Sequence, residues 1–292
     1  MKKILIGGSP CVYWSIVRQK KKQSGQRETA ANGMGYELFM NYVIAKEKFK
    51  PDFFIYENNK SISSEIKAEI SEKLGVKNVT INSALVSAQN RIREYWTNVE
   101  IKQPYDRNIT LDMVLENDVE PIIVCYPKFK EQYCRTYTGK SPTITAAGGG
   151  GHIPRVLLKG NNIEDVTTEN FRTTSRELLP VEVERLQTLP DNYTAGVSKT
   201  RRLTGLGNGW TAEVICEIIK SMNIPLDEHI EVLSMFDGIA TGRYCLDKLG
   251  YKNVTYKAYE IDEYAIKIAK NNYSDIVHCG DAYTVREESW TY

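Results

Sequence analysis

Three groups of residues in this sequence have types and spacing suited to chemistry. The first lies near the N-terminus, where a short apolar run at 4–6 breaks into Gly7-Gly8-Ser9-Pro10-Cys11. This pattern predicts a buried strand followed by a loop that presents a thiol. Functional groups of α/β proteins gather at such strand ends, but a single free cysteine is most often inert core. Cys11 is therefore a candidate nucleophile whose case depends on the other two groups.

The second group is a carboxylate and two arginines at the ends of further strands. A strand at 53–56 ends at Glu57-Asn58-Asn59, and a strand at 79–86 runs into the segment that holds Arg91 and Arg93. Taken singly, Glu57 fits a surface loop acid and Arg93 a structural ion pair. Their joint occurrence at strand ends favours a shared site over these alternatives.

The third group lies in the last quarter of the chain. An apolar strand beginning at His229 enters a glycine turn at 236–242, and Glu260 follows about twenty positions later at the end of the next strand. A carboxylate at that spacing can accept hydrogen bonds from a ribose diol. Gly280-Asp281 ends a third strand in the same way. Singly, Glu260 could cap a helix and Asp281 could be a turn residue, but together they favour a nucleoside cofactor. The turn lacks a P-loop lysine, which disfavours phosphate transfer.

The elements that must position these residues alternate along the chain. Apolar residues at helical spacing predict helices from Leu38 to Phe49, over 62–74 with Gly75 as the stop, at 180–187, after Thr211, and through Leu246 to Gly250. Strands that alternate with helices predict an α/β fold with a mostly parallel sheet and its functional groups along one edge. Between 97 and 171 the pattern weakens to a small irregular lobe with a strand at 122–124. Residues 222–228 are expected to be a linker.

Composition sets limits on the kind of protein. The chain has 292 residues, is 41% hydrophobic and 26% charged, and has a formal net charge of +1, so bulk charge indicates no nucleic-acid surface. Only a local cluster, such as the basic run 18–22, could contact phosphates, and a solvated run is the alternative. Six scattered cysteines without metal-site spacing predict reduced thiols and no metal site. No signal peptide or long apolar span is present, which predicts an intracellular protein without membrane contact.

These motifs together resemble the cytosine-5 DNA methyltransferase family over nearly the whole chain apart from the lobe. The matching segments are Gly7-Gly8-Ser9-Pro10-Cys11 (Pro-Cys motif), Glu57-Asn58 (Glu-Asn-Val), Gln89-Asn90-Arg91-Ile92-Arg93 (Gln-x-Arg-x-Arg), Arg185-Leu186-Gln187 with Pro190-Asp191 (Arg-Leu-Gln-Gly-Phe-Pro), Gly207-Asn208-Gly209-Trp210 (Gly-Asn), and Phe236-Asp237-Gly238-Ile239-Ala240-Thr241-Gly242 with Glu260 and Asp281 (cofactor motifs). The residues of these motifs are most similar to those of the catalytic domains of animal de novo methyltransferases.

The chain departs from the family pattern in two ways. Asn59 stands in place of Val, and Thr188-Leu189 in place of Gly-Phe. The cofactor motifs, which come first in the family, come last here, so the chain resembles a circular permutant opened between the third and fourth strands. The resemblance implies a Rossmann-like, S-adenosylmethionine-dependent methyltransferase fold with a small irregular target-recognition lobe. The implied parts are a catalytic half at 1–96, the lobe at 97–170, completing helices at 171–224 and a cofactor-binding half at 225–292.

The resemblance also implies the site residues. Cys11 would add to C6 of cytosine, Glu57 in protonated form would bond N3, and Arg93 with Arg91 would anchor the base. S-adenosyl-L-methionine would be the cofactor and S-adenosyl-L-homocysteine the product. The residues implied for the cofactor are Phe236, Asp237, Gly238, Ile239, Thr241, Gly242, Glu260, Ile261, Asp281, Asn208 and Trp210.

The implied partner is double-stranded DNA, with the target base flipped out of the helix. A loop at 12–27 would close over that base. The residues expected to contact DNA are Ser15, Val17, Arg18, Lys20, Lys21, Lys22, Arg135 and Thr145. We expect a monomer or homodimer in a bacterial or phage-infected cytoplasm, and host modification, including restriction-modification, is one setting for such an enzyme.

Two alternatives stay open at the level of sequence. One is an RNA cytosine methyltransferase of the related tRNA-acting branch, whose Cys-Phe-Thr signature is absent here. The other is a catalytically silent DNA-binding regulator. The intact Cys11, Glu57 and Arg93 argue against the regulator, whereas the departure at Asn59 leaves it open.

Overall fold

The computed structural model describes residues 1–15, 27–127, 133–146 and 153–292. It divides into two compact units. The large-sheet unit comprises Met1–Ile81, Ile92–Gln103 and Ile215–Tyr292. The small-sheet unit comprises Asn82–Arg91 and Pro104–Val214. These boundaries differ from the expected parts, because residues 171–214 group with the lobe and not with the methyltransferase sheet.

The large-sheet unit is built on a seven-stranded, mostly parallel sheet. Its strands are β1 (Lys2–Gly7), β2 (Phe53–Asn59), β3 (Val79–Asn82), β4 (Ile92–Thr97), β9 (Ile230–Met235), β10 (Val254–Tyr259) and β11 (Val277–Gly280), in the spatial order β11-β10-β9-β1-β2-β4-β3. β1 pairs in parallel with β2 and β9, and β10 pairs in parallel with β9 and β11. β4 runs antiparallel to β2. The predicted α/β class is confirmed.

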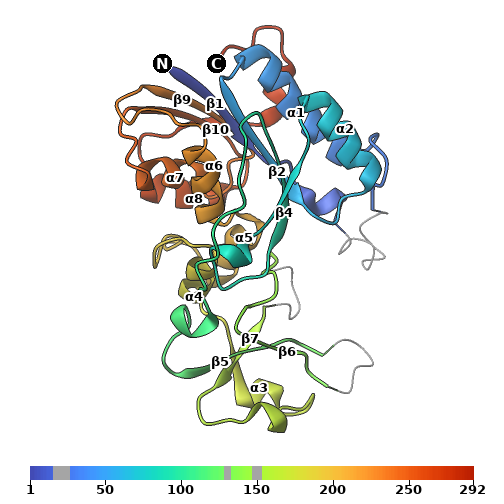
Figure 1. The fold of residues 1–292 in the computed structure, drawn as a ribbon, viewed down its shortest axis with the longest axis vertical. Coiled ribbons are helices and arrows are strands. Elements are labelled where there is room, and N and C mark those ends of the chain that lie inside the picture. The colour runs from blue at the N-terminus through green and yellow to red at the C-terminus, as the bar shows by residue number, and fades with distance from the viewer. Residues whose placement is uncertain (16–26, 128–132, 147–152) are drawn as a thin grey trace. The chain divides into compact units, whose positions relative to one another are not determined.

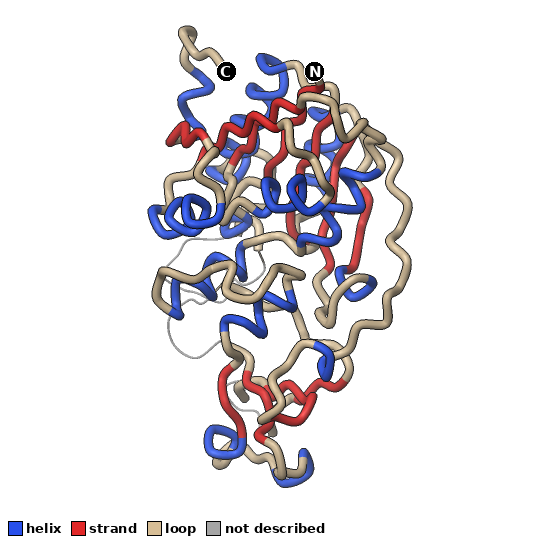
Figure 2. Tube along the Cα trace, turned by 90° about the vertical axis from the view of Figure 1, so that its left-hand side faces the viewer, coloured by secondary structure: helices blue, strands red, loops and turns tan. Residues whose placement is uncertain are grey.

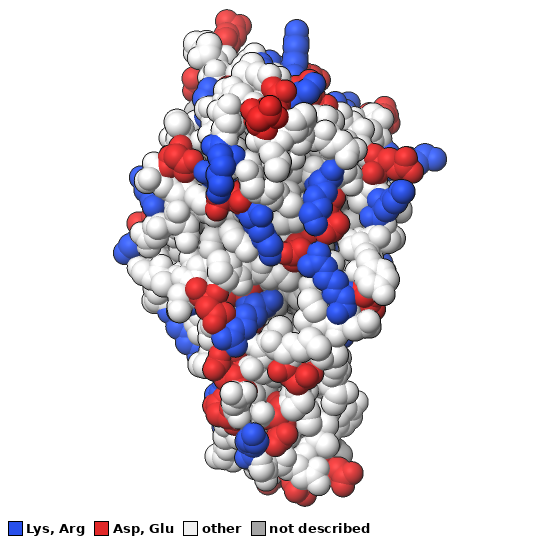
Figure 3. All heavy atoms as spheres, turned by 60° about the vertical axis from the view of Figure 1, so that its left-hand side comes forward, with Lys and Arg blue, Asp and Glu red and all other residues white. Residues whose placement is uncertain are grey.

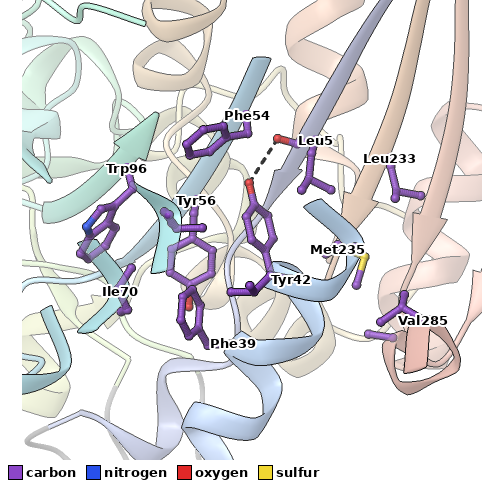
Figure 4. Packing of buried hydrophobic residues seen from close by; sticks show 14 of the residues in the cluster. Leu5, Phe39, Tyr42, Phe54, Tyr56, Ile70, Trp96, Leu233, Met235 and Val285 are labelled. Carbon is purple, nitrogen blue, oxygen red and sulfur yellow. Dashed lines mark hydrogen bonds between the residues drawn. The ribbon is translucent and has the colours of Figure 1, made fainter. Parts of the chain in front are cut away.

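Helices cover both faces of this sheet (Figure 1). They are α1 (Met34–Phe49), α2 (Ser64–Leu74), α6 (Ala212–Lys220), α7 (Thr241–Lys248) and α8 (Glu263–Asn272). In Figure 1, α1 and α2 lie on the face opposite to α7 and α8. The α1–α2 face buries an aromatic-rich core in which Phe39 and Tyr42 of α1 pack with Tyr56, Trp96 and other sheet residues (Figure 4). This burial is the main force that holds the strands under α1.

The small-sheet unit contains a second, antiparallel sheet (Figure 2). Its strands are β5 (Val119–Val124), β6 (Thr136–Thr138), β7 (Arg155–Leu158) and β8 (Ser175–Glu177), in the order β6-β5-β7-β8, and its helices are α3 (Phe171–Thr174), α4 (Pro180–Leu186) and α5 (Lys199–Asn208). Val124, Leu157 and Phe171 form its apolar cluster. The lobe is therefore more regular than its sequence predicts, because cross-strand pairing organises residues that carry no helical or alternating pattern of their own.

Most predicted elements are confirmed, with two corrections to strand bounds. The strand predicted at 79–86 ends at Asn82, because the Asn82 side chain accepts the amide of Ala84 and starts a 3-10 turn. β2 does not end before Glu57 but continues through Asn59, because Asn59 pairs with Arg93 of β4. Glu57 is thus a strand residue and not a loop residue.

Candidate active site

The register of the parallel strands brings the three sequence groups to one edge of the large sheet. Gly7, the last residue of β1, pairs with Met235 on one side and with Tyr56 on the other. Met235 in turn pairs with Tyr259. Because these pairs are level, the Cys11 loop, Glu57, the turn after Met235 and Glu260 all follow the same row of the sheet.

The loop that carries Cys11 is fixed against the strand that carries Glu57. After Gly7 the chain passes Pro10 and enters a 3-10 helix, η1 (Cys11–Tyr13), in which the Cys11 carbonyl accepts the amides of Trp14 and Ser15. A Cβ placed on Gly8 would lie 2.8 Å from the Glu57 carbonyl oxygen and 3.1 Å from Glu57 Oε2. Only glycine allows this approach, which seats the loop on Glu57. Cys11 itself is partly exposed.

Glu57 and Arg93 form an ion pair at the end of the β2–β4 ladder. Arg93 Nε lies 3.1 Å from Glu57 Oε1, and the two side chains are 15% and 12% exposed. β2 and β4 are antiparallel, so the two residues are diagonal neighbours on one face. Arg93 therefore does form a structural ion pair. Because its partner is the candidate catalytic acid, this ion pair is compatible with a role for Arg93 in the active site.

The turn that follows β9 has an unusual backbone. Phe236, Gly238 and Ala240 have φ values of 60°, 64° and 61°, so every second residue is left-handed, and two of them are not glycine. Glu260 holds the turn in this shape. Its Oε2 accepts the amide of Gly238 at 2.8 Å, and its Oε1 accepts the amides of Ile261 and Asp262 at 2.8 and 2.9 Å.

Hydrogen bonds decide between the alternative roles that the sequence allows for Glu260 and Asp281. The N-cap of α8 is Asp262, whose carboxylate accepts two α8 amides, and not Glu260. Asp281 does act as a turn residue, because its side chain accepts the amide of Tyr283 at the start of a 3-10 helix, η6 (Ala282–Arg286). Asp281 is nevertheless exposed, and a carboxylate that accepts one amide has acceptor capacity for further hydrogen bonds.

Asp237 points from the same turn back into the sheet. Its Oδ1 accepts the hydroxyls of Ser234 and Tyr256, each at 2.6 Å. Its Oδ2 is buried and has no hydrogen-bond partner among the described residues. Burial, with a smaller contribution from the charge of Glu260, raises the pKa of Asp237 to about 6.

The residues present fit a nucleoside cofactor. A Cβ built on Gly238 or on Gly280 meets nothing within 4 Å, so backbone at both strand ends borders open space. Ile261, beside the Glu260 carboxylate, is 73% exposed, which supplies an apolar surface next to a hydrogen-bond acceptor. Ile239, Thr241 and Gly242 are buried, so among the predicted cofactor residues these support the turn and do not border the open space.

The remaining predicted residues of the small-sheet unit have structural contacts of their own. Arg91 is 2% exposed, and its guanidinium donates to the carbonyls of Ile144, Gly207 and Gly209 at 2.7 to 3.0 Å. The Arg91 guanidinium thus stabilises the backbone of the small-sheet unit, which differs from the expected role of anchoring the base. Asn208, the last residue of α5, is exposed, and Trp210 is partly exposed.

The predicted DNA contacts are only partly within the described residues. Thr145 is exposed, and Ser15 and Arg135 are partly exposed. Val17, Arg18, Lys20, Lys21 and Lys22 lie outside the described residues. Figure 3 shows Lys and Arg side chains interspersed with Asp and Glu over the face in view, in keeping with the small net charge. No helix in the described ranges is long and apolar enough to cross a membrane.

Two buried residues beside the site, Ser9 and Tyr56, escaped the sequence analysis. In the sequence Tyr56 stands at the end of an apolar run, directly before Glu57. The signal was available, because a buried tyrosine hydroxyl needs a hydrogen-bond partner. The structure supplies Ser9 as that partner.

Comparisons with known proteins agree on one family. The family model described as C-5 cytosine-specific DNA methylase matches residues 1–77 and 76–223. The chain is similar to DNA (cytosine-5)-methyltransferase DRM2 of Oryza sativa subsp. japonica, with 32% identity over 94 residues, which is 32% of this chain and 16% of that protein. It is also similar to the type II methyltransferase M.Sau3AI of Staphylococcus aureus, with 22% identity over 235 residues, 71% of this chain and 57% of that protein. The chain thus spans less than two thirds of either relative.

A solved structure supports the fold. The methyltransferase EhMeth of Entamoeba histolytica superposes with a TM-score of 0.51 at 16% identity, covering 77% of this chain and 78% of that one. At this identity the likeness shows shared architecture alone.

Proposed function

The chain belongs to the C-5 cytosine-specific DNA methylase family, and from this premise we propose that it transfers a methyl group from S-adenosylmethionine to C5 of cytosine in duplex DNA. The observation that carries the proposal is the common level of Gly7, Tyr56, Met235 and Tyr259 in the sheet. Because of that register, the thiol, the acid–arginine pair and the turn that fits a nucleoside all follow the same row of the sheet.

Each residue has a role that the chemistry requires. C5 of cytosine is a poor nucleophile, so a nucleophile must first add at C6, and Cys11 is the thiol placed to do so. Electron density then develops on the ring, and Glu57 in protonated form stabilises it through N3, with its carboxyl oriented by Arg93. Once the methyl group is on C5, a water molecule or weak base takes the C5 proton and the Cys11 thiolate is eliminated, which completes the turnover.

Glu260, Asp281 and Ile261 are proposed to hold the cofactor. Glu260 accepts the ribose hydroxyls, Asp281 accepts a donor of the adenine or methionine end, and the exposed Ile261 side chain covers an apolar face. When bound, S-adenosylmethionine supplies an electrophilic methyl group and leaves as S-adenosylhomocysteine. Phe236 and Gly238 present the backbone against which it lies, and Asn208 and Trp210 remain proposed contacts from the small-sheet unit.

The choice of DNA as substrate rests on two supports. The Cys-Phe-Thr signature of the tRNA-acting branch is absent, and the two similar proteins are named as a DNA (cytosine-5)-methyltransferase and a type II methyltransferase. The basic run at 18–22, with Ser15, Arg135 and Thr145, is proposed to contact the duplex. The small-sheet unit is proposed to choose the target sequence.

We also propose that the chain order is a circular permutation of the family order. The segment 225–292, which carries the cofactor turn, lies beyond the residues that the family model matches, yet its β9 pairs with β1, the central strand of the sheet. A resemblance to the animal de novo enzymes stays a prediction, since the relatives reported above come from a plant and a bacterium.

The test is transfer of radiolabelled methyl from S-adenosylmethionine to mixed-sequence duplex DNA and, separately, to tRNA, followed by nucleoside analysis. Label in 5-methyldeoxycytidine supports the proposal. Label confined to tRNA would replace DNA by RNA as the substrate, and absence of label from both would favour the silent regulator.

The matched variants are Cys11→Ser and Cys125→Ser. Cys125 is a partly exposed thiol of the small-sheet unit, outside the proposed chemistry. Cys11→Ser is expected to lower methyl transfer at least about a thousandfold, because a hydroxyl is far less nucleophilic than a thiolate, with cofactor binding unchanged. Cys125→Ser should keep full activity. Full activity in Cys11→Ser would refute the mechanism.

A further inference from the structure

A buried hydrogen-bond cluster joins the strand of Glu57 to the loop of Cys11. The hydroxyls of Tyr56 and Ser9 are 2.6 Å apart, and the Asn58 amide donates to the Ser9 carbonyl at 3.2 Å and to the Tyr56 hydroxyl at 3.4 Å. Tyr56, Asn58 and Ser9 are 0%, 1% and 3% exposed. Each polar group therefore depends on the others, because water does not replace a lost partner there.

Asn59 fixes the direction of this cluster. The backbone N–H and the side-chain amide of Asn59 both donate to Asn58 Oδ1, at 2.9 and 3.1 Å. Of the two ends of a side-chain amide only the oxygen can accept a backbone N–H, so the NH2 group of Asn58 must face Ser9. The Asn59 Oδ1 in turn accepts from Ser61. The residue that departs from the family motif is thus built into the support of Asn58.

The ring of Tyr56 has little freedom to move its hydroxyl. It packs against Phe39, Tyr42 and Trp96, with ring centroids 5.1, 4.9 and 5.7 Å away, in the core shown in Figure 4. A rigidly held hydroxyl is a good anchor for a loop, because the loop cannot shift without breaking the bond or the packing. Ser9 is two residues before Cys11, and Tyr56 directly precedes Glu57.

We propose that the Ser9–Tyr56–Asn58 cluster is a positioning device that sets the Cys11 thiol relative to Glu57. Three contacts support it: the hydroxyl bond, the Asn58 bond to the Ser9 carbonyl, and the glycine contact of Gly8 on Glu57. The proposal rests on the proposed function, since it deepens the account of the same site. Ser9 and Tyr56 act through Cys11 and do not touch substrate.

The variants are Tyr56→Phe, Ser9→Ala and the double variant, with Tyr42→Phe as the matched control. Tyr42 is also fully buried, packs against Tyr56 with tilted rings, and loses hydrogen bonds to the Leu5 and Ile55 carbonyls when its hydroxyl is removed. Those carbonyls lie within β1 and β2 and not in the Cys11 loop. The control therefore removes a comparable hydroxyl from the same core without releasing the nucleophile.

Two readouts are needed. The first is kcat, with KM for DNA and Kd for cofactor measured alongside. Tyr56→Phe and Ser9→Ala should each lower kcat about threefold to tenfold, as the loss of one buried hydrogen bond implies. Cofactor Kd should stay constant, and the double variant should be no worse than either single variant. Tyr42→Phe should leave kcat unchanged.

The second readout is independent of methyl transfer: the rate at which iodoacetamide alkylates Cys11, followed by peptide mass spectrometry. Tyr56→Phe and Ser9→Ala should change this rate at least about threefold, and Tyr42→Phe should not. If both variants match Tyr42→Phe in alkylation, the positioning role is overturned. If wild type methylates neither DNA nor tRNA but the alkylation rates separate, the proposed function fails and the positioning device stands.

Discussion

Glu260 illustrates how one carboxylate can both hold the backbone of a ligand site and form part of its surface. It accepts three amides from two strand ends, and these bonds keep the left-handed turn at Phe236 and Gly238 in place. A carboxylate has acceptor capacity beyond three hydrogen bonds, so the same group can still accept from a ribose. The acid therefore shapes the site and also forms part of its surface.

Replacing Glu260 tests this double role. Glu260→Gln puts an NH2 group where an oxygen now accepts amides, so the turn loses at least one charge-assisted bond. We expect the Kd for S-adenosylmethionine to rise about tenfold to a hundredfold. Isothermal titration calorimetry measures it. The control is Glu263→Gln, an exposed acid in the first turn of α8, and equal affinities in the two variants would contradict the role of Glu260.

Asp237 predicts a pH-dependent stability. Its pKa is about 6 in the folded protein, above the ordinary value of 3.8, so the folded state binds the proton more tightly than the unfolded state. The stabilisation from this proton is complete below about pH 3 and is lost as pH rises through about 6, for a total of about 3 kcal/mol.

The measurement is the free energy of unfolding of wild type and Asp237→Asn between pH 4 and pH 8. Wild type should lose about 2 kcal/mol relative to the variant between pH 4 and pH 6.5, with a nearly constant difference above that. Asp227→Asn, at an exposed carboxyl in the loop before β9, should track wild type at every pH. A difference between wild type and Asp237→Asn that does not vary with pH would contradict the assignment.

At the scale of elements, the spacing of apolar residues and the positions of glycines predict the helices and strand ends, because short-range interactions determine them. The helix over 62–74 was predicted from four apolar residues and Gly75, and the structure confirms it with Gly75 left-handed at the C-cap. The strand ends were predicted because apolar runs stop at polar or glycine residues. That was enough to bring Cys11, Glu57 and Glu260 into one hypothesis.

The structural features that the sequence does not predict depend on residues that are distant in the chain. β4 exists as a strand because β2 pairs with it, and α5 contains Gly205 and Gly207, which disfavour a helix by about 1 kcal/mol each. α5 is held by outside donors, since Gln187 bonds the Leu206 carbonyl and Arg91 bonds that of Gly207. The role of Arg91 and the Ser9–Tyr56 bond were likewise invisible to spacing alone.

A capping residue offers a test at this scale. The Ser63 hydroxyl accepts the amide of Ile66 at 3.2 Å and donates to the Thr29 carbonyl at 2.6 Å, so it closes the start of α2. Ser63→Ala should lower the free energy of unfolding by about 1 kcal/mol. Ser64→Ala, at the exposed neighbouring position, serves as the control and should change it by less than about 0.5 kcal/mol. Chemical denaturation distinguishes the two.

At the scale of the molecule, the two ends of the chain lie close together in the large-sheet unit (Figure 1). Lys3 Nζ donates to the Tyr292 hydroxyl at 2.8 Å and lies 4.1 Å from the centre of its ring, and Tyr292 also packs edge-on against Phe49. Leu226 and Asp227, between α6 and β9, are exposed. These are the conditions under which a chain can be reopened elsewhere at small cost.

A reordered chain tests the proposed permutation. Residues 227–292, a flexible linker of about ten residues, and residues 1–226 would place the cofactor turn before Cys11. We expect the same fold by circular dichroism and methyl transfer within about tenfold of the original, because no strand pairing is interrupted. A control opened inside β9, between Val232 and Leu233, should not fold. Failure of both chains would contradict the expectation.

The common level of the strand ends also decides where this chain can gain or lose residues over evolutionary time. Deleting one residue from β1 would draw the Cys11 loop back by about 3.3 Å relative to both neighbours and turn its side chains to the opposite faces. Such a deletion would be harmful whichever residue were lost. Insertions before β9, around Leu226, change no distance between the reacting groups. Descendants of this chain should therefore vary in length there and keep the interval from Gly7 to Cys11 constant.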